Sequence, residues 1–139
     1  MAHFLTVVIV GANVPAPVEL AENFMRAYFS PDLALSPDAK CDGYTIGGRY
    51  DGMLFGKEQN YNLTPSEFES RYGFDAVRQE DNAWPVAGVI SDILPFAVIA
   101  PDGAWFDRDN KPDEQWRKES LAILEEYPDH LAVAFDCHC

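Results

Sequence analysis

The sequence contains few cysteines and no long apolar run. Its three cysteines among 139 residues are an odd and sparse set, whereas a small secreted domain held by disulfides has an even, regularly spaced set. Cys41, Cys137 and Cys139 are therefore expected to be free thiols in a reducing compartment. The apolar stretch near the start covers about eight residues and lacks the basic start and the length that export or membrane insertion requires. We expect a cytoplasmic protein with no membrane association.

Basic side chains are also scarce. Ten lysines and arginines stand against 23 aspartates and glutamates, which gives a formal net charge of -13. This charge repels a phosphate backbone and so excludes non-specific nucleic-acid binding. It favours solubility or a basic partner, and a carboxylate-rich surface could also mimic nucleic acid and occupy a basic DNA-binding protein.

Apolar residues are abundant enough for a sizeable core. They make up 47% of the sequence, and 139 residues match the usual size of one domain. No internal repeat or low-complexity segment interrupts the chain. The sequence therefore predicts one domain over residues 1–139.

Several segments have the periodicity of regular structure. β-Branched runs bounded by turn residues indicate strands, and apolar residues at helical spacing indicate amphipathic helices. The predicted elements are a strand over residues 3–10, a helix beginning at Pro17, a hairpin over residues 96–106, a helix that includes Trp116 and Tyr127, and a strand over residues 131–135.

The order strand, helix, hairpin, helix, strand predicts an α+β fold. It matches the split βαβ arrangement of ferredoxin-like domains, an antiparallel sheet with two helices on one face. Residues of about 30 to 92 form a glycine-rich insertion, in which residues 74–92 have no assignable structure. In this layout the last strand runs antiparallel beside the first, which places His3 near Cys137 and Cys139.

A glycine-flanked arginine within the insertion is the first candidate site. Gly47 and Gly48 would let backbone amides approach a ligand, and the guanidinium of Arg49 would grip a carboxylate or phosphate. Tyr44 and Tyr50 would add stacking surface. The structural alternative is that the glycines shape a bulge and that Arg49 pairs with a carboxylate, which would hold the insertion to the sheet.

The final four residues are the second candidate site. Alternation along a strand puts Cys137 and Cys139 on one face and Asp136 and His138 on the other. In an enzyme, Asp136 would orient His138 as an acid–base pair while Arg49 stabilises developing negative charge. Side chains two residues apart on one strand, however, reach each other only loosely.

A zinc site is a further alternative for the cysteines. Cys137 and Cys139 on one face, joined by His3 or Cys41, form a possible ligand set. Structural zinc sites usually place two or more residues between paired cysteines, so the spacing here favours no cofactor. In that interpretation Cys137 is a small buried apolar residue.

Two aromatic residues near the predicted loops complete the survey. His130 lies in the turn before the last strand, where we expect it to be exposed and without a role. Trp84 follows two acidic residues in a predicted loop, where an exposed ring would mark a contact surface.

The chain resembles an uncharacterised group of small phage and bacterial proteins. The resemblance rests on a His-Phe start, a Tyr-x-Ile-Gly-Gly-Arg-aromatic-x-Gly segment, Pro-aromatic-Ala-Val, Asp-Gly-x-Trp and a closing Asp-Cys-His. The matching stretches are residues 3–4, 44–52, 95–98, 102–105 and 136–138. The resemblance implies a phage-type accessory protein and supplies no activity.

Three functions follow as hypotheses. The first is an accessory protein that binds a protein partner or a small anionic ligand through Gly47, Gly48 and Arg49. The second is an enzyme acting on a phosphate-bearing or nucleotide-like substrate through Arg49, Asp136 and His138. The third is a nucleic-acid mimic that occupies a basic partner.

Overall fold

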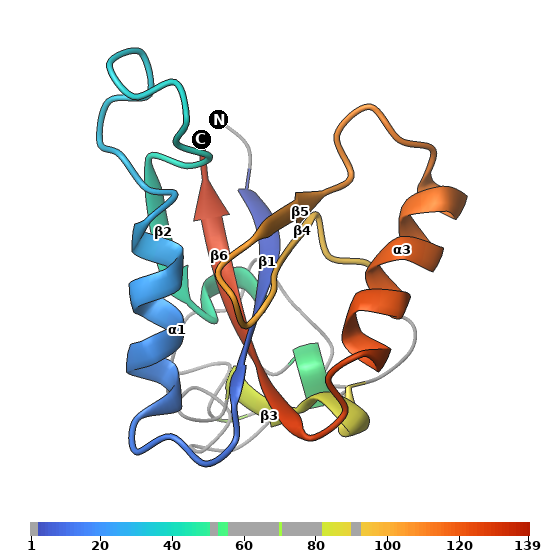
Figure 1. The fold of residues 1–139 in the computed structure, drawn as a ribbon. Helices are drawn as coiled ribbons and strands as arrows, with labels where there is room; N and C mark the ends of the chain where they lie inside the picture. Colours follow the sequence, from blue (N-terminus) through green and yellow to red (C-terminus); the bar gives the residue numbers. More distant parts are fainter. Residues whose placement is uncertain (1–2, 51–52, 56–69, 71–81, 90–92) are drawn as a thin grey trace.

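A mixed β-sheet forms the centre of the computed structural model (Figure 1). The structure describes residues 3–50, 53–55, 70, 82–89 and 93–139, and the statements below concern these residues. Residues 51–52, 56–69, 71–81 and 90–92 of the predicted insertion lie outside the described residues. None of the described helices is long and apolar enough to cross a membrane.

The sheet has six strands, and the last strand in the sequence lies beside the first. The strands are β1 (His3–Gly11), β2 (Gly43–Ile46), β3 (Ala83–Pro85), β4 (Ala97–Ile99), β5 (Trp105–Asp107) and β6 (His130–His138). Their order is β2-β6-β1-β4-β5, and β3 also pairs with β6. Strand β1 runs parallel to β4 and antiparallel to β6, and β2 and β3 run antiparallel to β6.

Two α-helices and three short 3₁₀ helices complete the described structure. They are α1 (Pro17–Arg26), α3 (Asp113–Glu125), η1 (Gly48–Tyr50), η2 (Met53–Phe55) and η5 (Val86–Gly88). Helix α1 has proline at its start, where the missing amide hydrogen is not needed. Helix α3 begins with Asp113 and Glu114, whose negative charges suit a helix N-terminus.

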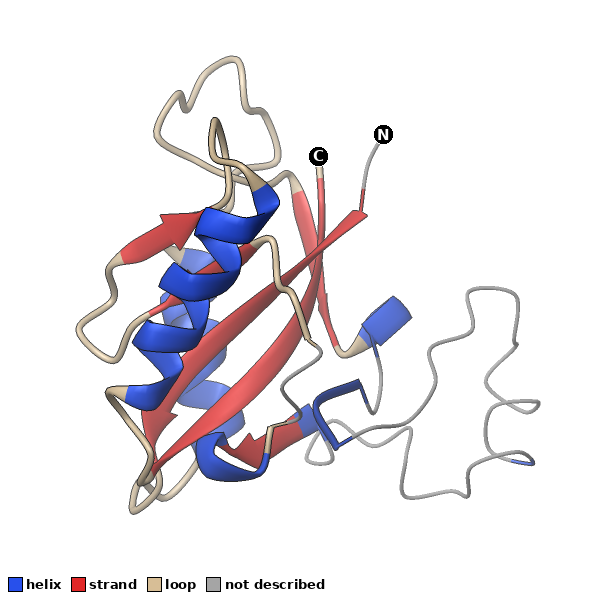
Figure 2. Cartoon of the chain, turned by 90° about the vertical axis from the view of Figure 1, so that its right-hand side faces the viewer, coloured by secondary structure: helices blue, strands red, loops and turns tan. Residues whose placement is uncertain are grey.

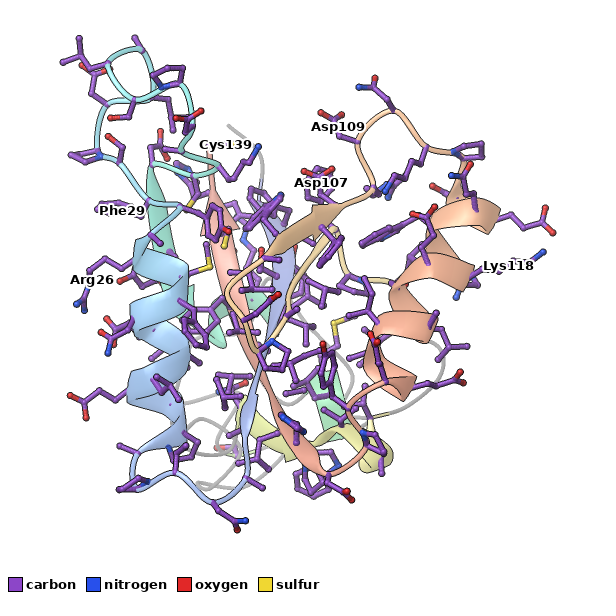
Figure 3. All side chains as sticks on the ribbon, viewed as in Figure 1. Arg26, Phe29, Asp107, Asp109, Lys118 and Cys139 are labelled. Carbon is purple, nitrogen blue, oxygen red and sulfur yellow. The ribbon has the colours of Figure 1, made fainter. Side chains whose placement is uncertain are left out.

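Each face of the sheet is covered by one α-helix. Along β1, the side chains of Leu5, Val7 and Ile9 pack on the side of α3, whereas Val8 and Val10 pack on the side of α1. Figure 1 shows the strands between the two helices, and Figure 3 shows Arg26 of α1 and Lys118 of α3 pointing away from the sheet. The alternation along β1 therefore fills two cores, one on each face.

The predicted hairpin and the antiparallel pairing of the first and last strands are both confirmed. Strands β4 and β5 pair antiparallel, and β1 pairs with β6 from His3 opposite His138 to Gly11 opposite His130. The α+β class is confirmed as well. Figure 2 shows β1 beginning and β6 ending at the same end of the sheet, and this end carries the candidate site.

Two parts of the predicted fold are corrected. The sheet is mixed rather than antiparallel because β1 and β4 run parallel, and the two helices cover opposite faces rather than one.

The helices lie on opposite faces because β2 pairs with β6. Helix α1 connects β1 to β2 beyond β6, and α3 connects β5 to β6. Both connections cross the sheet in the same direction between parallel strands, but the two strand pairs run in opposite directions. Right-handed crossovers then place the helices on opposite faces.

Candidate functional site

Two histidines face each other across the first and last strands. His3 begins β1 and His138 ends β6, and the two residues are direct partners in the antiparallel register. Direct partners project from the same face of a sheet. Their ring centroids are 4.9 Å apart with an interplanar angle of 69°. Each side chain is 27% exposed, so solutes can reach both rings.

His3 is held by a buried carboxylate. Its Nδ1 lies 2.7 Å from Oδ1 of Asp136, whose side chain is only 7% exposed. The other carboxylate oxygen, Oδ2, accepts a hydrogen bond of 2.9 Å from the backbone amide of Arg49. A carboxylate only accepts hydrogen bonds, so Nδ1 of His3 is the donor. This leaves the Nε2 lone pair of His3 as the basic position of the ring.

His138 has the same arrangement with a different carboxylate. Its Nδ1 lies 3.0 Å from Oδ1 of Asp42. The backbone amide of Asp42 donates to the carbonyl oxygen of His138 at 2.9 Å, so main-chain and side-chain contacts join the same two residues. Both imidazoles therefore present Nε2 while Nδ1 is oriented by a carboxylate.

Gly48 lies so close to Asp136 that no side chain fits at this position. Its φ is +54°, in the left-handed region that side chains rarely adopt. A Cβ atom at Gly48 would lie 2.6 Å from both Cβ and Oδ2 of Asp136, which is closer than real contacts allow. Only glycine thus lets the chain cross over the buried carboxylate.

The amides of the glycine-flanked segment are used inside the protein. Gly47 donates to the carbonyl of Ala134 at 2.9 Å, and Tyr50 donates to the carbonyl of Gly47 at 2.9 Å. The amide of Arg49 binds Asp136, as described above. The amides of Gly47 and Arg49 therefore fasten the segment to β6, and that of Tyr50 closes the turn within it. This agrees with the structural alternative in that the segment is held to the sheet, here through backbone amides.

Asp136, His138 and the backbone of Arg49 lie at the same end of β6, and the pairing of Asp136 differs from the prediction. The backbone of Arg49 reaches Asp136, and His138 lies at the same end of β6. Asp136 binds His3 across the strand pair rather than His138 along its own strand. Asp42, the partner of His138, was not identified from the sequence. It comes close to His138 because it precedes Gly43, which pairs with His138 in the β2–β6 register.

The two predicted stacking tyrosines lie on opposite faces of the sheet. The ring of Tyr44 packs near Phe29 and Phe135, with ring centroids 5.5 Å and 5.9 Å away, and its hydroxyl donates to Glu22. Tyr50 is 9% exposed in the core beneath α3. The two rings therefore do not form a pair of platforms on either side of Arg49.

Only two of the predicted zinc ligands are in contact. Cys41 and Cys137 lie together, fully buried in the core beneath α1, whereas His3 pairs with His138 and Asp136 on the other face. Within the described residues, no group of three or more His, Cys, Asp and Glu side chains could hold a metal ion.

Cys137 is buried as the alternative interpretation predicted. Its thiol lies 3.3 Å from Oγ1 of Thr6, and it also shares a hydrogen bond with the thiol of Cys41. The hydrogen bond with Cys41, together with burial, raises the pKa of Cys137. This residue therefore stays a neutral thiol at physiological pH. Cys139 is exposed at the end of the sheet (Figure 3).

His130 is half-buried, which corrects its expected exposure. It opens β6 at the end opposite to the candidate site and packs against Tyr127, with ring centroids 5.2 Å apart. Trp84 is 37% exposed, and its indole nitrogen donates to the carbonyl of Gly88 at 3.1 Å.

Comparisons with known proteins identify no family for this chain. No protein-family model matches the sequence, and neither a curated protein nor a solved structure matches it. The resemblance to small phage and bacterial proteins stays a prediction from the sequence.

Proposed function

We propose that His3 and His138 form the acid–base centre of an enzyme that acts on a small phosphate-bearing or nucleotide-like substrate. The observation that carries this proposal is the pair of imidazoles 4.9 Å apart, each held through Nδ1 by its own carboxylate. Of the residues predicted from the sequence, Asp136 and His138 are part of this centre, and His3 and Asp42 join them.

The reaction we propose is hydrolysis of a phosphate ester. One neutral imidazole accepts a proton at Nε2 from the attacking water as the new oxygen–phosphorus bond forms. The other imidazole, protonated, gives its Nε2 proton to the leaving oxygen as the old oxygen–phosphorus bond breaks. Asp136 and Asp42 orient the rings and stabilise whichever imidazole is positively charged.

Arg49 would stabilise the negative charge of the transferred group. Its backbone amide is fixed by Asp136, the partner of His3, and the residue is exposed. A guanidinium there is suited to phosphoryl oxygens. The net charge of -13 limits the substrate to a small anion, because a polyanion would be repelled.

A hydrolysis screen tests the proposal. Bis(p-nitrophenyl) phosphate, p-nitrophenyl phosphate and a panel of nucleotides, cyclic ones included, would be assayed with the wild-type protein and its His3→Ala and His138→Ala variants. We expect turnover that falls at least about 100-fold in either variant, because each loses one proton-transfer step.

The third histidine supplies the control. His130→Ala removes an imidazole at the far end of β6 and should leave turnover unchanged. Absence of turnover on every substrate would contradict the proposal, as would turnover that survives in the His3→Ala and His138→Ala variants.

The other two hypotheses remain predictions from the sequence. Binding of a protein partner or small anionic ligand through Gly47, Gly48 and Arg49 predicts a thermal shift or partner capture that is lost in Arg49→Ala and kept in His3→Ala. A nucleic-acid mimic predicts surface carboxylates in two rows at phosphate-like spacing.

A further inference from the structure

We infer that His3 and His138 also form a binding site for one divalent transition-metal ion such as Zn²⁺, bound through both Nε2 atoms with water completing the coordination. This inference goes beyond the proposed enzyme activity and does not depend on it. It starts from the direct cross-strand pairing of the two histidines.

The orientation of both rings is that of metal-binding histidines. In such sites the nitrogen that does not bind the metal usually donates to a carboxylate or carbonyl, which fixes the ring and raises its basicity. Nδ1 of His3 lies 2.7 Å from Asp136, and Nδ1 of His138 lies 3.0 Å from Asp42. Nε2 is thus the ligand atom of each ring, and imidazole nitrogen suits zinc, copper and nickel.

The separation of the rings fits a shared ion. With metal–nitrogen bonds of about 2.1 Å, each ring centroid lies about 3.2 Å from the ion, so two rings have centroids about 4.5 Å apart at a right angle and about 5.2 Å apart at a tetrahedral angle. The observed 4.9 Å lies between these values. The centroid separation is therefore compatible with one ion shared by the two imidazoles.

The local and overall charges favour a cation. Asp42 and Asp136 place two carboxylates directly behind the imidazoles, and the chain carries a formal charge of -13. Both raise the local concentration of divalent cations. The exposure of 27% for each imidazole side chain gives the ion access.

Calorimetric titration of the apo-protein with ZnCl₂ tests the inference. A Cys139→Ser background removes the exposed thiol, which could otherwise bind zinc. We expect one zinc per chain, with affinity at least about tenfold weaker after His3→Ala or His138→Ala, and about 10- to 100-fold weaker after Asp42→Asn, because the carboxylate behind the ring is lost. Titration with Co²⁺ should give visible absorption bands that are lost in the same histidine variants.

The controls separate this site from scattered surface binding. His130→Ala keeps the full negative charge and should leave zinc affinity unchanged. If an alanine variant does not fold by circular dichroism, the glutamine variant at the same position replaces it. Zinc binding that survives loss of both histidines, or an affinity for wild type no better than about 1 mM, would overturn the inference.

The result is distinct from the test of enzyme activity. Metal and proton compete for the same Nε2 lone pairs, so zinc should suppress the proposed turnover. Zinc binding without any turnover would contradict the enzyme and support the metal site, whereas turnover without zinc binding would do the reverse.

Discussion

Two constraints act together at Gly48. Its backbone has φ of +54°, and its Cα lies so close to Asp136 that an added Cβ would be 2.6 Å from the carboxylate. Gly103 has φ of +88° with nothing within 4 Å of an added Cβ. The two glycines therefore separate backbone strain from steric contact.

We predict that Gly48→Ala lowers the free energy of unfolding by about 3 kcal/mol, because strain and collision add, and that Gly103→Ala lowers it by about 1 kcal/mol through strain alone. Urea denaturation followed by circular dichroism measures both values. Equal losses in the two variants would mean that the approach of Gly48 to Asp136 is not a close one.

At the scale of elements, α3 contributes the largest fully buried side chain that the structure describes. Trp116 is fully buried, and its indole nitrogen donates to the carbonyl oxygen of Pro95 at 2.6 Å. Pro95 precedes β4, so this hydrogen bond ties the helix to the segment that enters the sheet.

We predict that Trp116→Phe lowers the free energy of unfolding by about 2 to 3 kcal/mol, because the buried carbonyl loses its partner and the smaller ring leaves space. Trp84→Phe is the matched control, since Trp84 also donates to a carbonyl but is 37% exposed, and we expect it to cost less than about 1 kcal/mol. Guanidinium denaturation gives both numbers. A larger loss for Trp84 than for Trp116 would rule out this account of how α3 is held.

The sequence predicts the elements better than their arrangement. The strand predicted over residues 3–10 is observed as His3–Gly11, and the helix predicted to begin at Pro17 does so. Periodicity shows which side of a helix is apolar, but not which face of a sheet it covers. That face depends on the pairing of β2 with β6, which Gly43–Ile46 does not reveal by itself.

The candidate site was predictable in part for the same reason. Antiparallel pairing of the first and last strands correctly placed His3 near the final residues. The exchange of partners, with His3 on Asp136 and His138 on Asp42, depends on exact register and on the path of the chain before β2. Local sequence carries neither.

For the whole molecule, the formal charge of -13 means that like charges repel one another across its surface. Ion pairs such as Lys111 with Glu119 and Arg26 with Glu22 lie at the surface. Such pairs contribute little to stability. Repulsion between carboxylates therefore lowers the stability of the folded chain, and added salt weakens this repulsion.

We predict that raising NaCl from about 20 mM to about 500 mM increases the melting temperature by about 3 to 5 °C, because screening weakens this repulsion. Differential scanning calorimetry measures the change, and KCl at the same ionic strength should have the same effect. A melting temperature that falls with salt would show that attractive ion pairs outweigh the repulsion.

The position of β6 has a consequence for synthesis on the ribosome. Residues 130–138 pair with β1, β2 and β3, so the strand joins segments from the first, second and third quarters of the described chain. Until residue 138 has emerged, β1 lacks its longest partner, and β2 and β3 lack the strand they pair with. The nascent chain must therefore keep its apolar β1 segment from aggregating until nearly all of the domain is translated, and chaperone contact during translation would be most useful over that interval.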